Sequence, residues 1–260
     1  MSRLAAVLAV AFALAACERQ APPLPSTDPS PTSALPPAAS ATPSAAGIRF
    51  IERITGGAGT SDPLPLIVAI HGRGGRPEKI GRLFDSFEGR ARVVLPYGFE
   101  TSGEGYAWFS HWGDDPAFAD ETRSAADRVA AMIAEIARLR PTVGKPIVTG
   151  FSQGGILSFT LAVLHPELVR AAFPAGGFLA PALYPSVWPK GLAMSRLHAF
   201  HGTDDETVPV TKARATVQRL KEIGVPAELT EYPGVRHQIS KEMRHDMMLD
   251  IEAAVSSAPP

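Results

Sequence analysis

Short runs of Val, Ile, Leu and Ala alternate with longer amphipathic stretches from about residue 49 onward, and this alternation limits the fold more than any other feature. Strands that alternate with helices predict a mostly parallel central sheet with helices on both faces. The predicted strands are Arg49–Ile54, Leu66–Ile70, Arg92–Leu95, Ile147–Gly150, Ala171–Pro174, Leu197–Phe200 and Glu228–Tyr232. The predicted helices begin near Pro77, Asp120, Gln153, Thr211 and Ser240. The expected fold class is therefore α/β.

The helix expected from about Asp120 to Arg140 has an apolar residue at every third or fourth position, which predicts one buried face. The residues on this face are Val129, Ile133, Ile136 and Leu139. Asp120 and Thr122 are candidate caps for its start, and Pro141 is expected to end it.

The first residues of the chain predict a secretory signal. Leu4 to Ala16 form an apolar run preceded by Arg3, too short for a membrane span, which needs about 20 residues. The run ends in Leu14-Ala15-Ala16-Cys17, which resembles the bacterial lipoprotein box. The resemblance implies cleavage after residue 16, acylation of Cys17, and a lipid anchor in the bacterial cell envelope. Glu18 rather than Asp after the cysteine favours the outer membrane.

Two alternatives for this cysteine are an ordinary secreted protein and a spare thiol. Cys17 is the only cysteine in the chain, so a disulfide within one molecule is excluded. Residues 17–46 are mainly Pro, Ala, Ser and Thr, a composition that predicts a disordered tether. Residues 47–260 are then long enough for one α/β domain.

The charge balance bears on possible partners. The formal net charge is −1, and no basic run is present. This argues against binding to nucleic acid and provides no electrostatic reason for binding an anionic membrane surface.

The segment GFSQGG, Gly150 to Gly155, lies between a predicted strand and a predicted helix. Gly-x-Ser-x-Gly in this context is typical of the nucleophile elbow, a tight turn that exposes a serine hydroxyl at a reaction site. The flanking glycines are small because the strained turn leaves no room for side chains beside Ser152. A serine needs a base to take its proton and an acid to hold that base.

His237 is the expected base, because it follows the last strand in a polar loop and the order serine, acid, histidine is typical of the elbow. The other downstream histidines have structural interpretations, as a helix end, a strand residue, a strand-end turn and a solvated helix face: His165, His198, His201 and His245. For the acid, Asp204, Asp205 and Glu206 are adjacent, and general rules do not choose among them.

The segments GFSQGG, HGTDDETVP and GVRH resemble those of the phospholipase/carboxylesterase family, which has the α/β-hydrolase fold and includes acyl-protein thioesterases. Tyr106-Ala107-Trp108-Phe109 is a further match. The family pattern H-G-x-x-D-x-x-V-P implies that Asp205 is the acid of the triad. It also implies an oxyanion hole formed by the backbone N–H groups of Arg73 and Gln153.

The same resemblance leaves the roles of four side chains open. Trp108 and Phe109 either line the acyl pocket or belong to the core. Arg73 stands where the family has an apolar residue and Arg76 follows it, so these arginines either favour acidic acyl or leaving groups or point into solvent. His71 is expected to anchor its loop by hydrogen bonds.

These observations predict a membrane-tethered serine hydrolase that cleaves carboxylic esters through an acyl-enzyme on Ser152, without a metal or an organic cofactor. No His/Cys/Asp spacing typical of zinc ligands occurs in the sequence. A thioesterase or lysophospholipase would use the same residues, and a polyester or feruloyl-type esterase is a further alternative. A non-catalytic binding module is the alternative from another class, but it has no need to keep serine, acid, base and oxyanion loop together.

Overall fold

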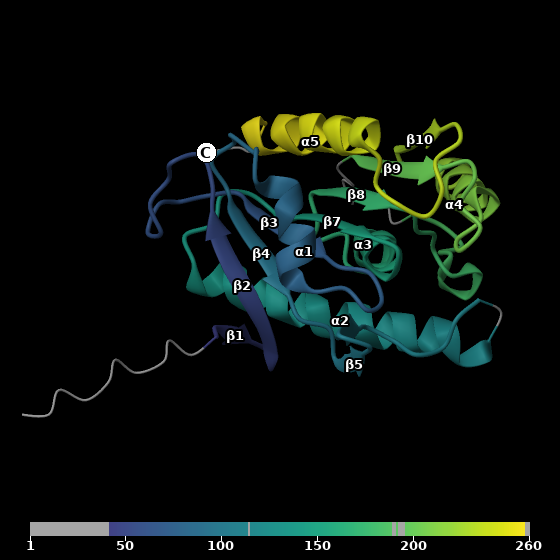
Figure 1. Ribbon diagram of the computed structural model, residues 1–260, viewed down its shortest axis with the longest axis horizontal. Helices are drawn as coiled ribbons and strands as arrows, with labels where there is room; N and C mark the ends of the chain where they lie inside the picture. Colours follow the sequence, from purple (N-terminus) through teal and green to yellow (C-terminus); the bar gives the residue numbers. More distant parts are fainter. Residues whose placement is uncertain (1–41, 114, 189–190, 192–195, 258–260) are drawn as a thin grey trace, which may run out of the picture. The chain divides into compact units, whose positions relative to one another are not determined.

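The computed structural model describes residues 42–113, 115–188, 191 and 196–257 (Figure 1). Eight strands of this described part form one sheet in the order β1-β2-β4-β3-β7-β8-β9-β10. Pairing is parallel from β4 to β10, whereas β2 pairs antiparallel with β1 and β4. The strands are β1 (Ser44–Ala45), β2 (Ile48–Ile54), β3 (Leu66–Ile70), β4 (Arg92–Pro96), β7 (Ile147–Phe151), β8 (Ala171–Ala175), β9 (Leu197–Gly202) and β10 (Ala227–Tyr232).

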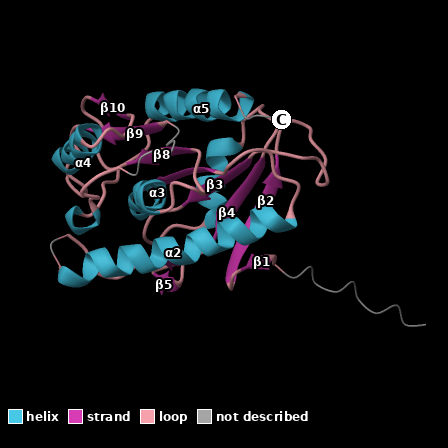
Figure 2. Ribbon diagram, turned by 180° about the vertical axis from the view of Figure 1, so that it is seen from behind, coloured by secondary structure: helices cyan, strands magenta, loops and turns pink. Residues whose placement is uncertain are grey.

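Helices cover both faces of the sheet, as Figures 1 and 2 show with α5 and α2 on opposite sides. The helices are α1 (Pro77–Gly81), α2 (Pro116–Leu139), α3 (Gln153–Leu164), α4 (Val210–Glu222), α5 (Lys241–Ser256) and the short 3₁₀ turns η1 (Arg82–Phe84) and η2 (Pro181–Leu183). The predicted α/β class, a mostly parallel sheet between helices, is confirmed.

The buried strand β3 shows how one strand serves two cores. Leu66, Val68 and Ile70 pack in the cluster that contains the buried faces of α2, α3 and α4. Ile67 and Ala69 point to the other face and pack in the cluster with α1 and α5. Because successive side chains of a strand point to opposite faces, a strand buried on both sides is a continuous apolar run. This explains why LIVAI was recognisable in the sequence.

Every predicted strand is present, with ends that agree to within two residues. A two-stranded hairpin, β5 (Glu100–Ser102) and β6 (Gly105–Ala107), was not predicted. Its strands have only three residues each, too few to show an alternating pattern in the sequence.

The folded domain begins earlier than the predicted boundary at residue 47. Ser44 and Ala45 form β1 on the edge of the sheet, and the amide of Phe50 donates to the carbonyl of Pro43 at 3.0 Å. The backbone N–H of Ala46 donates to Glu135 of α2. The predicted tether therefore ends before residue 43. The predicted signal peptide, Cys17 and residues 17–41 of the tether lie outside the described residues.

Helix α2 begins at Pro116 rather than near Asp120, so the predicted caps are wrong. Asp115 is the N-cap and accepts a hydrogen bond from the amide of Ala117 at 2.8 Å. A proline at the first position suits a helix start, because its missing N–H would have no partner there. Thr122 instead lies within the helix, where its hydroxyl donates to the carbonyl of Phe118.

The predicted apolar face of α2 is buried except at its end. Val129, Ile133 and Ile136 are at most 2% exposed, whereas Leu139 in the last turn is 48% exposed. The helix ends at Leu139, directly before Arg140 and the predicted stop at Pro141. The terminal turn therefore extends beyond the core.

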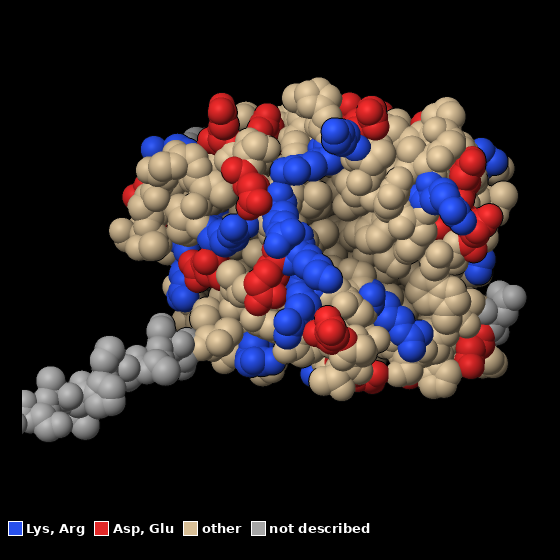
Figure 3. Space-filling view, in the orientation of Figure 1, with Lys and Arg blue, Asp and Glu red and all other residues tan. Residues whose placement is uncertain are grey.

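Surface charge is distributed unevenly, although the chain as a whole is nearly neutral. Figure 3 shows a run of Lys and Arg side chains on one face, over the region where Figure 1 places α1. None of the helices in the described residues is long and apolar enough to cross a membrane.

Candidate active site

Ser152 lies at the sharp turn between β7 and α3, and its backbone is strained. Its φ of 58° lies in the left-handed region that residues other than glycine rarely adopt. The turn is held because the amide of Ser152 donates to the carbonyl of Ala175 at 3.0 Å. A Cβ added to Gly154 would lie 1.9 Å from the carbonyl oxygen of Ile70, so this position accepts only glycine. The structure thus has the strand-to-helix elbow that the Gly-x-Ser-x-Gly pattern predicts.

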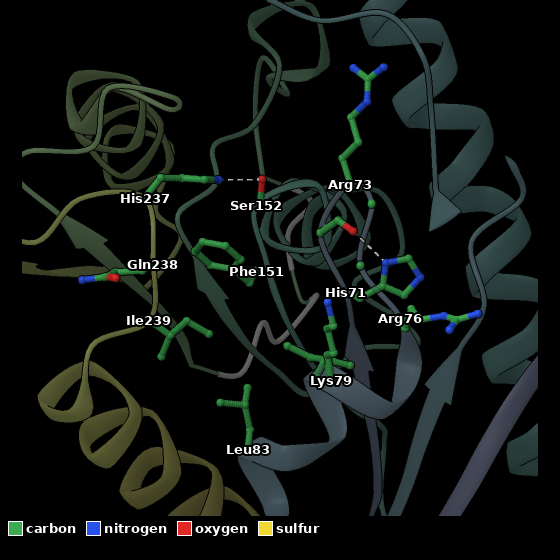
Figure 4. A pocket seen from close by; sticks show the side chains of 14 residues that line it. His71, Arg73, Arg76, Lys79, Leu83, Phe151, Ser152, His237, Gln238 and Ile239 are labelled. Carbon is green, nitrogen blue, oxygen red and sulfur yellow. Dashed lines mark hydrogen bonds between the residues drawn. The ribbon is translucent and has the colours of Figure 1, made fainter. Parts of the chain in front are cut away.

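Three side chains from separate parts of the chain form one hydrogen-bonded row. The Nε2 of His237 lies 2.9 Å from Ser152 Oγ (Figure 4), and its Nδ1 lies 2.7 Å from Asp205 Oδ2. An ionised carboxylate only accepts, so Nδ1 carries the proton and Nε2 is free to accept from the serine hydroxyl. This is the arrangement needed for proton transfer from serine to histidine.

The structure brings Asp205, and neither of its acidic neighbours, to the histidine. Its Oδ1 accepts hydrogen bonds from the amides of Thr207 at 3.0 Å and Val208 at 2.8 Å, which leaves Oδ2 for His237. Asp205 is only 5% exposed. Asp204 is exposed and accepts a hydrogen bond from the hydroxyl of Thr203.

Glu206 is also exposed, and it pairs with Arg236 at 3.1 Å. His201 stabilises the turn that carries the three acidic residues. Its Nε2 lies 2.8 Å from the carbonyl oxygen of Val208 and 3.5 Å from Asp205 Oδ2. Burial lowers the pKa of His201 from its ordinary value, so it is neutral at neutral pH and donates this hydrogen bond. His201 lies within β9, one residue before the strand ends, rather than in the strand-end turn that the sequence predicts.

The loop after β3 lies against the elbow. A Cβ added to Gly72 would lie 3.0 Å from Ser152 Cβ. Within the described part of the chain, the backbone N–H groups of Arg73 and Gln153 make no hydrogen bond. Two open backbone donors in the segments next to a serine hydroxyl would suit a developing oxyanion.

The side chain of Gln153 has a separate structural task. It is fully buried, its Oε1 accepts from the amide of Trp108 at 3.0 Å, and its Nε2 donates to the carbonyl of Phe109 at 2.8 Å. Both ends of the amide are therefore satisfied, as a buried polar group requires. The side chain of Gln153 thus holds the 106–109 segment in place, while the backbone N–H of Gln153 donates to no described residue.

His71 anchors its loop, as expected. Its Nε2 accepts from the amide of Gly98 at 3.2 Å, so Nδ1 carries the proton and donates to the carbonyl of Gly72 at 2.8 Å (Figure 4). Burial lowers the pKa of His71, which favours this neutral form. The imidazole holds the loop to the segment after β4.

The structure places Trp108 and Phe109 in the core, which is the second of the two interpretations of these residues. Neither residue lines the cavity at Ser152. Each is 2% exposed. The indole Nε1 of Trp108 donates to the carbonyl of His71 at 2.8 Å, and Phe109 packs edge-to-face on Phe118. Phe99 and Trp112, from the same part of the chain, are partly buried and pack against this core.

A cavity of about 450 Å³ opens beside Ser152 and His237. Sequence reasoning missed its apolar lining, which comprises Ile80, Leu83, Phe151 and Ile239. Phe151 and Ile239 were detectable as neighbours of the serine and the histidine. Leu83 is on η1, and no local signal links it to the site.

No group of His, Cys, Asp and Glu side chains in the described ranges is arranged to hold a metal ion. The polar side chains that line the cavity include Ser152, His237 and three cationic residues, together with the open backbone amide of Arg73. They are suited to acyl transfer by a nucleophile rather than to metal ligation.

Comparisons with known proteins agree with this geometry. The sequence profile of the family described as Phospholipase/Carboxylesterase matches residues 61–254. Carboxylesterase SOBER1 of Arabidopsis thaliana is 32% identical over 100 residues, which are 38% of this chain and 44% of that protein. Lysophospholipase-like protein 1 of Mus musculus is 26% identical over 152 residues, 56% of this chain and 63% of that protein. The chain thus matches less than two thirds of the length of these relatives.

Solved structures extend the likeness to nearly the whole domain. Esterase PE8 has a TM-score of 0.69 at 20% identity, covering 79% of this chain and 98% of that one. Acyl-protein thioesterase 2 of Zea mays has a TM-score of 0.65 at 18% identity, covering 80% and 99%. At these identities the likeness shows the shared α/β-hydrolase fold alone, while the profile covers most of the chain. The chain belongs to the phospholipase/carboxylesterase family of α/β-hydrolases.

Proposed function

We propose that the chain is a serine hydrolase that cleaves carboxylic esters through an acyl-enzyme on Ser152. The observation that carries the proposal is the row from Asp205 through His237 to Ser152, beside a cavity of about 450 Å³. Relatives named as carboxylesterases support the same class of reaction.

In the first half of the reaction, Ser152 Oγ attacks the ester carbonyl carbon and its proton moves to His237 Nε2. The carbonyl oxygen becomes an oxyanion, held by the backbone N–H groups of Arg73 and Gln153. The carbon–oxygen bond to the alcohol then breaks, and His237 returns the proton to the departing alcohol. An acyl group remains on Ser152.

In the second half, water replaces the alcohol. His237 accepts a proton from the water as its oxygen attacks the acyl carbon, and a second oxyanion forms. The bond to Ser152 Oγ breaks, the proton passes to the serine, and the carboxylic acid leaves. Throughout, Asp205 holds the imidazole in one tautomer and offsets the positive charge of the protonated ring.

The experiment that tests this proposal combines turnover with covalent labelling. The full chain, solubilised in mild detergent, is assayed on 4-nitrophenyl esters from acetate to decanoate and then treated with a fluorophosphonate. We expect turnover of at least one ester, loss of that turnover after treatment, and a modified peptide that contains Ser152. Turnover that survives complete labelling, or a label on another serine, would contradict the proposal. Heat-denatured protein is the control for nonspecific labelling.

The proposal includes a lipid anchor on Cys17 that places the domain at the bacterial envelope, with residues 18–42 as a tether. The lipoprotein-like box before the cysteine supports it. We expect Cys17→Ser to move the protein from the membrane fraction to the soluble fraction after expression in a bacterial host. Ser33→Ala, within the tether, is the control and should stay with the membrane. Membrane retention of the cysteine variant would refute the anchor.

A further inference from the structure

The cavity beside Ser152 has walls of unlike character. Ile80, Leu83, Phe151 and Ile239 form an apolar side, whereas Arg73, Arg76 and Lys79 contribute three cations. No aspartate or glutamate of the described residues lines this space. An apolar surface facing unbalanced positive charge suits a molecule that is apolar at one end and anionic at the other.

None of the acidic side chains that the structure describes pairs with the three cations. Within the described part of the chain, no carboxylate oxygen lies within 4.0 Å of the charged groups of Arg73, Arg76 or Lys79. Some exposed arginines elsewhere on the surface do have a carboxylate partner, for example Arg214 with Glu231 at 2.5 Å.

Glu78, the acidic residue nearest to the three cations in the sequence, makes its hydrogen bond to a different residue. Glu78 is adjacent to Lys79 in sequence, but its Oε1 accepts a hydrogen bond from the hydroxyl of Tyr97 at 3.1 Å. It is not among the residues that line the cavity. The positive charge at the cavity is therefore not neutralised by its own helix.

The three side chains point in different directions. In Figure 4 the Lys79 side chain extends along the cavity toward the loop that carries His71, with its ammonium group at the end. The guanidinium of Arg73 extends outward past Ser152, and that of Arg76 points away from the serine. All three side chains are exposed, and Lys79 is the one whose charged end extends along the cavity; the two arginines, which point away, are called the rim arginines.

We infer that this site selects esters that carry a carboxylate or phosphate group, with Lys79 as the residue that binds the anion. The inference rests on the proposed ester hydrolysis at Ser152 and names its substrate class. The apolar wall would hold the hydrocarbon part, while Lys79 pairs with the anion and the rim arginines raise the local concentration of anionic substrate. The acyl side and the alcohol side of the ester are both possible sources of the anion.

The experiment compares matched pairs of chromogenic esters, using the full chain in detergent. For an anion on the alcohol side, the pair is 2-nitrophenyl octanoate and its 5-carboxy derivative. For an anion on the acyl side, the pair is the methyl ester of 4-nitrophenyl adipate and the free acid. The measured quantity is the ratio of kcat/KM for the anionic ester to that for the neutral ester, after subtraction of the rate without enzyme.

We expect this ratio to fall about fivefold in Lys79→Gln for one of the two pairs, near the upper end of what an exposed charge pair contributes. Lys79→Arg keeps the positive charge and should restore most of the wild-type ratio. Lys145→Gln is the matched control, because Lys145 is exposed and precedes the opposite end of β7 from Ser152. The wild-type ratio should also fall as salt rises, since screening weakens an exposed charge.

The outcomes separate this inference from the proposed function. The pair whose ratio responds identifies which side of the ester carries the anion. A ratio that Lys79→Gln leaves unchanged for both pairs, alongside turnover of the neutral esters, would overturn the anion preference and leave the esterase intact. Absence of turnover on all four esters, with no fluorophosphonate label on Ser152, would overturn both.

Discussion

Replacing Ser152 by alanine is expected to lower kcat/KM for the preferred ester by about 10⁴-fold or more, the size of effect seen when a nucleophile of this type is removed. The loss is large because the hydroxyl oxygen forms the covalent bond and nothing else in the cavity replaces it. The fold should persist, since Ser152 Oγ contacts only His237 by hydrogen bond and the backbone bonds of the turn remain.

The measurement is initial-rate hydrolysis of the best 4-nitrophenyl ester, with thermal unfolding followed in parallel. Ser158→Ala is the matched control: Ser158 is on α3, the helix that follows Ser152, and its hydroxyl donates to the backbone carbonyl of Gly154. This control should keep its rate within severalfold. A Ser152→Ala enzyme that retains a tenth of the wild-type rate would exclude the serine mechanism.

The second large effect is expected for Asp205→Asn, with a loss of about 10⁴-fold in kcat, as for a triad whose acid becomes an amide. An amide group presented to His237 Nδ1 stabilises the wrong tautomer, in which Nε2 carries the proton and cannot accept another. The oxygen of asparagine can still accept from the amides of Thr207 and Val208, so the turn should fold.

Asp204→Asn is the comparison that makes this result specific. Asp204 is exposed and accepts one hydrogen bond from the hydroxyl of Thr203, so its variant should hydrolyse esters within about twofold of wild type. Both variants are measured by single-turnover and steady-state kinetics. A greater loss in Asp204→Asn than in Asp205→Asn would mean that a different acid serves His237.

Much of the site was predictable because its residues lie directly after strands. Parallel strands end at one edge of the sheet, so the segments that follow β3, β7, β9 and β10 meet there. His237 and Asp205 are 32 positions apart and 2.7 Å from each other. The choice of Asp205 over its neighbours depended on resemblance to a family, since three adjacent acids differ only in how the turn directs them.

Aromatic residues and cavity walls were less predictable. Tryptophan and phenylalanine in a long loop are consistent with a pocket lining or with the core. Whether they are buried depends on which other segments pack against them. For Trp108 the deciding contact is its Nε1 hydrogen bond to the carbonyl of His71, 37 positions away. The start of α2 differs from the prediction for a local reason: Asp115-Pro116 is a stronger start signal than Asp120.

Local patterns in the sequence were enough for the class of fold and for the proposed nucleophile and base, because strand runs and the glycine-flanked serine reflect backbone geometry. Contacts between distant segments were needed to see that Asp205 lies beside His237, that Trp108 and Phe109 belong to the core, and that Lys79 extends along the cavity while Arg76 points away. The reason is physical: side-chain direction and burial depend on contacts between segments far apart in the chain, and no local pattern records them.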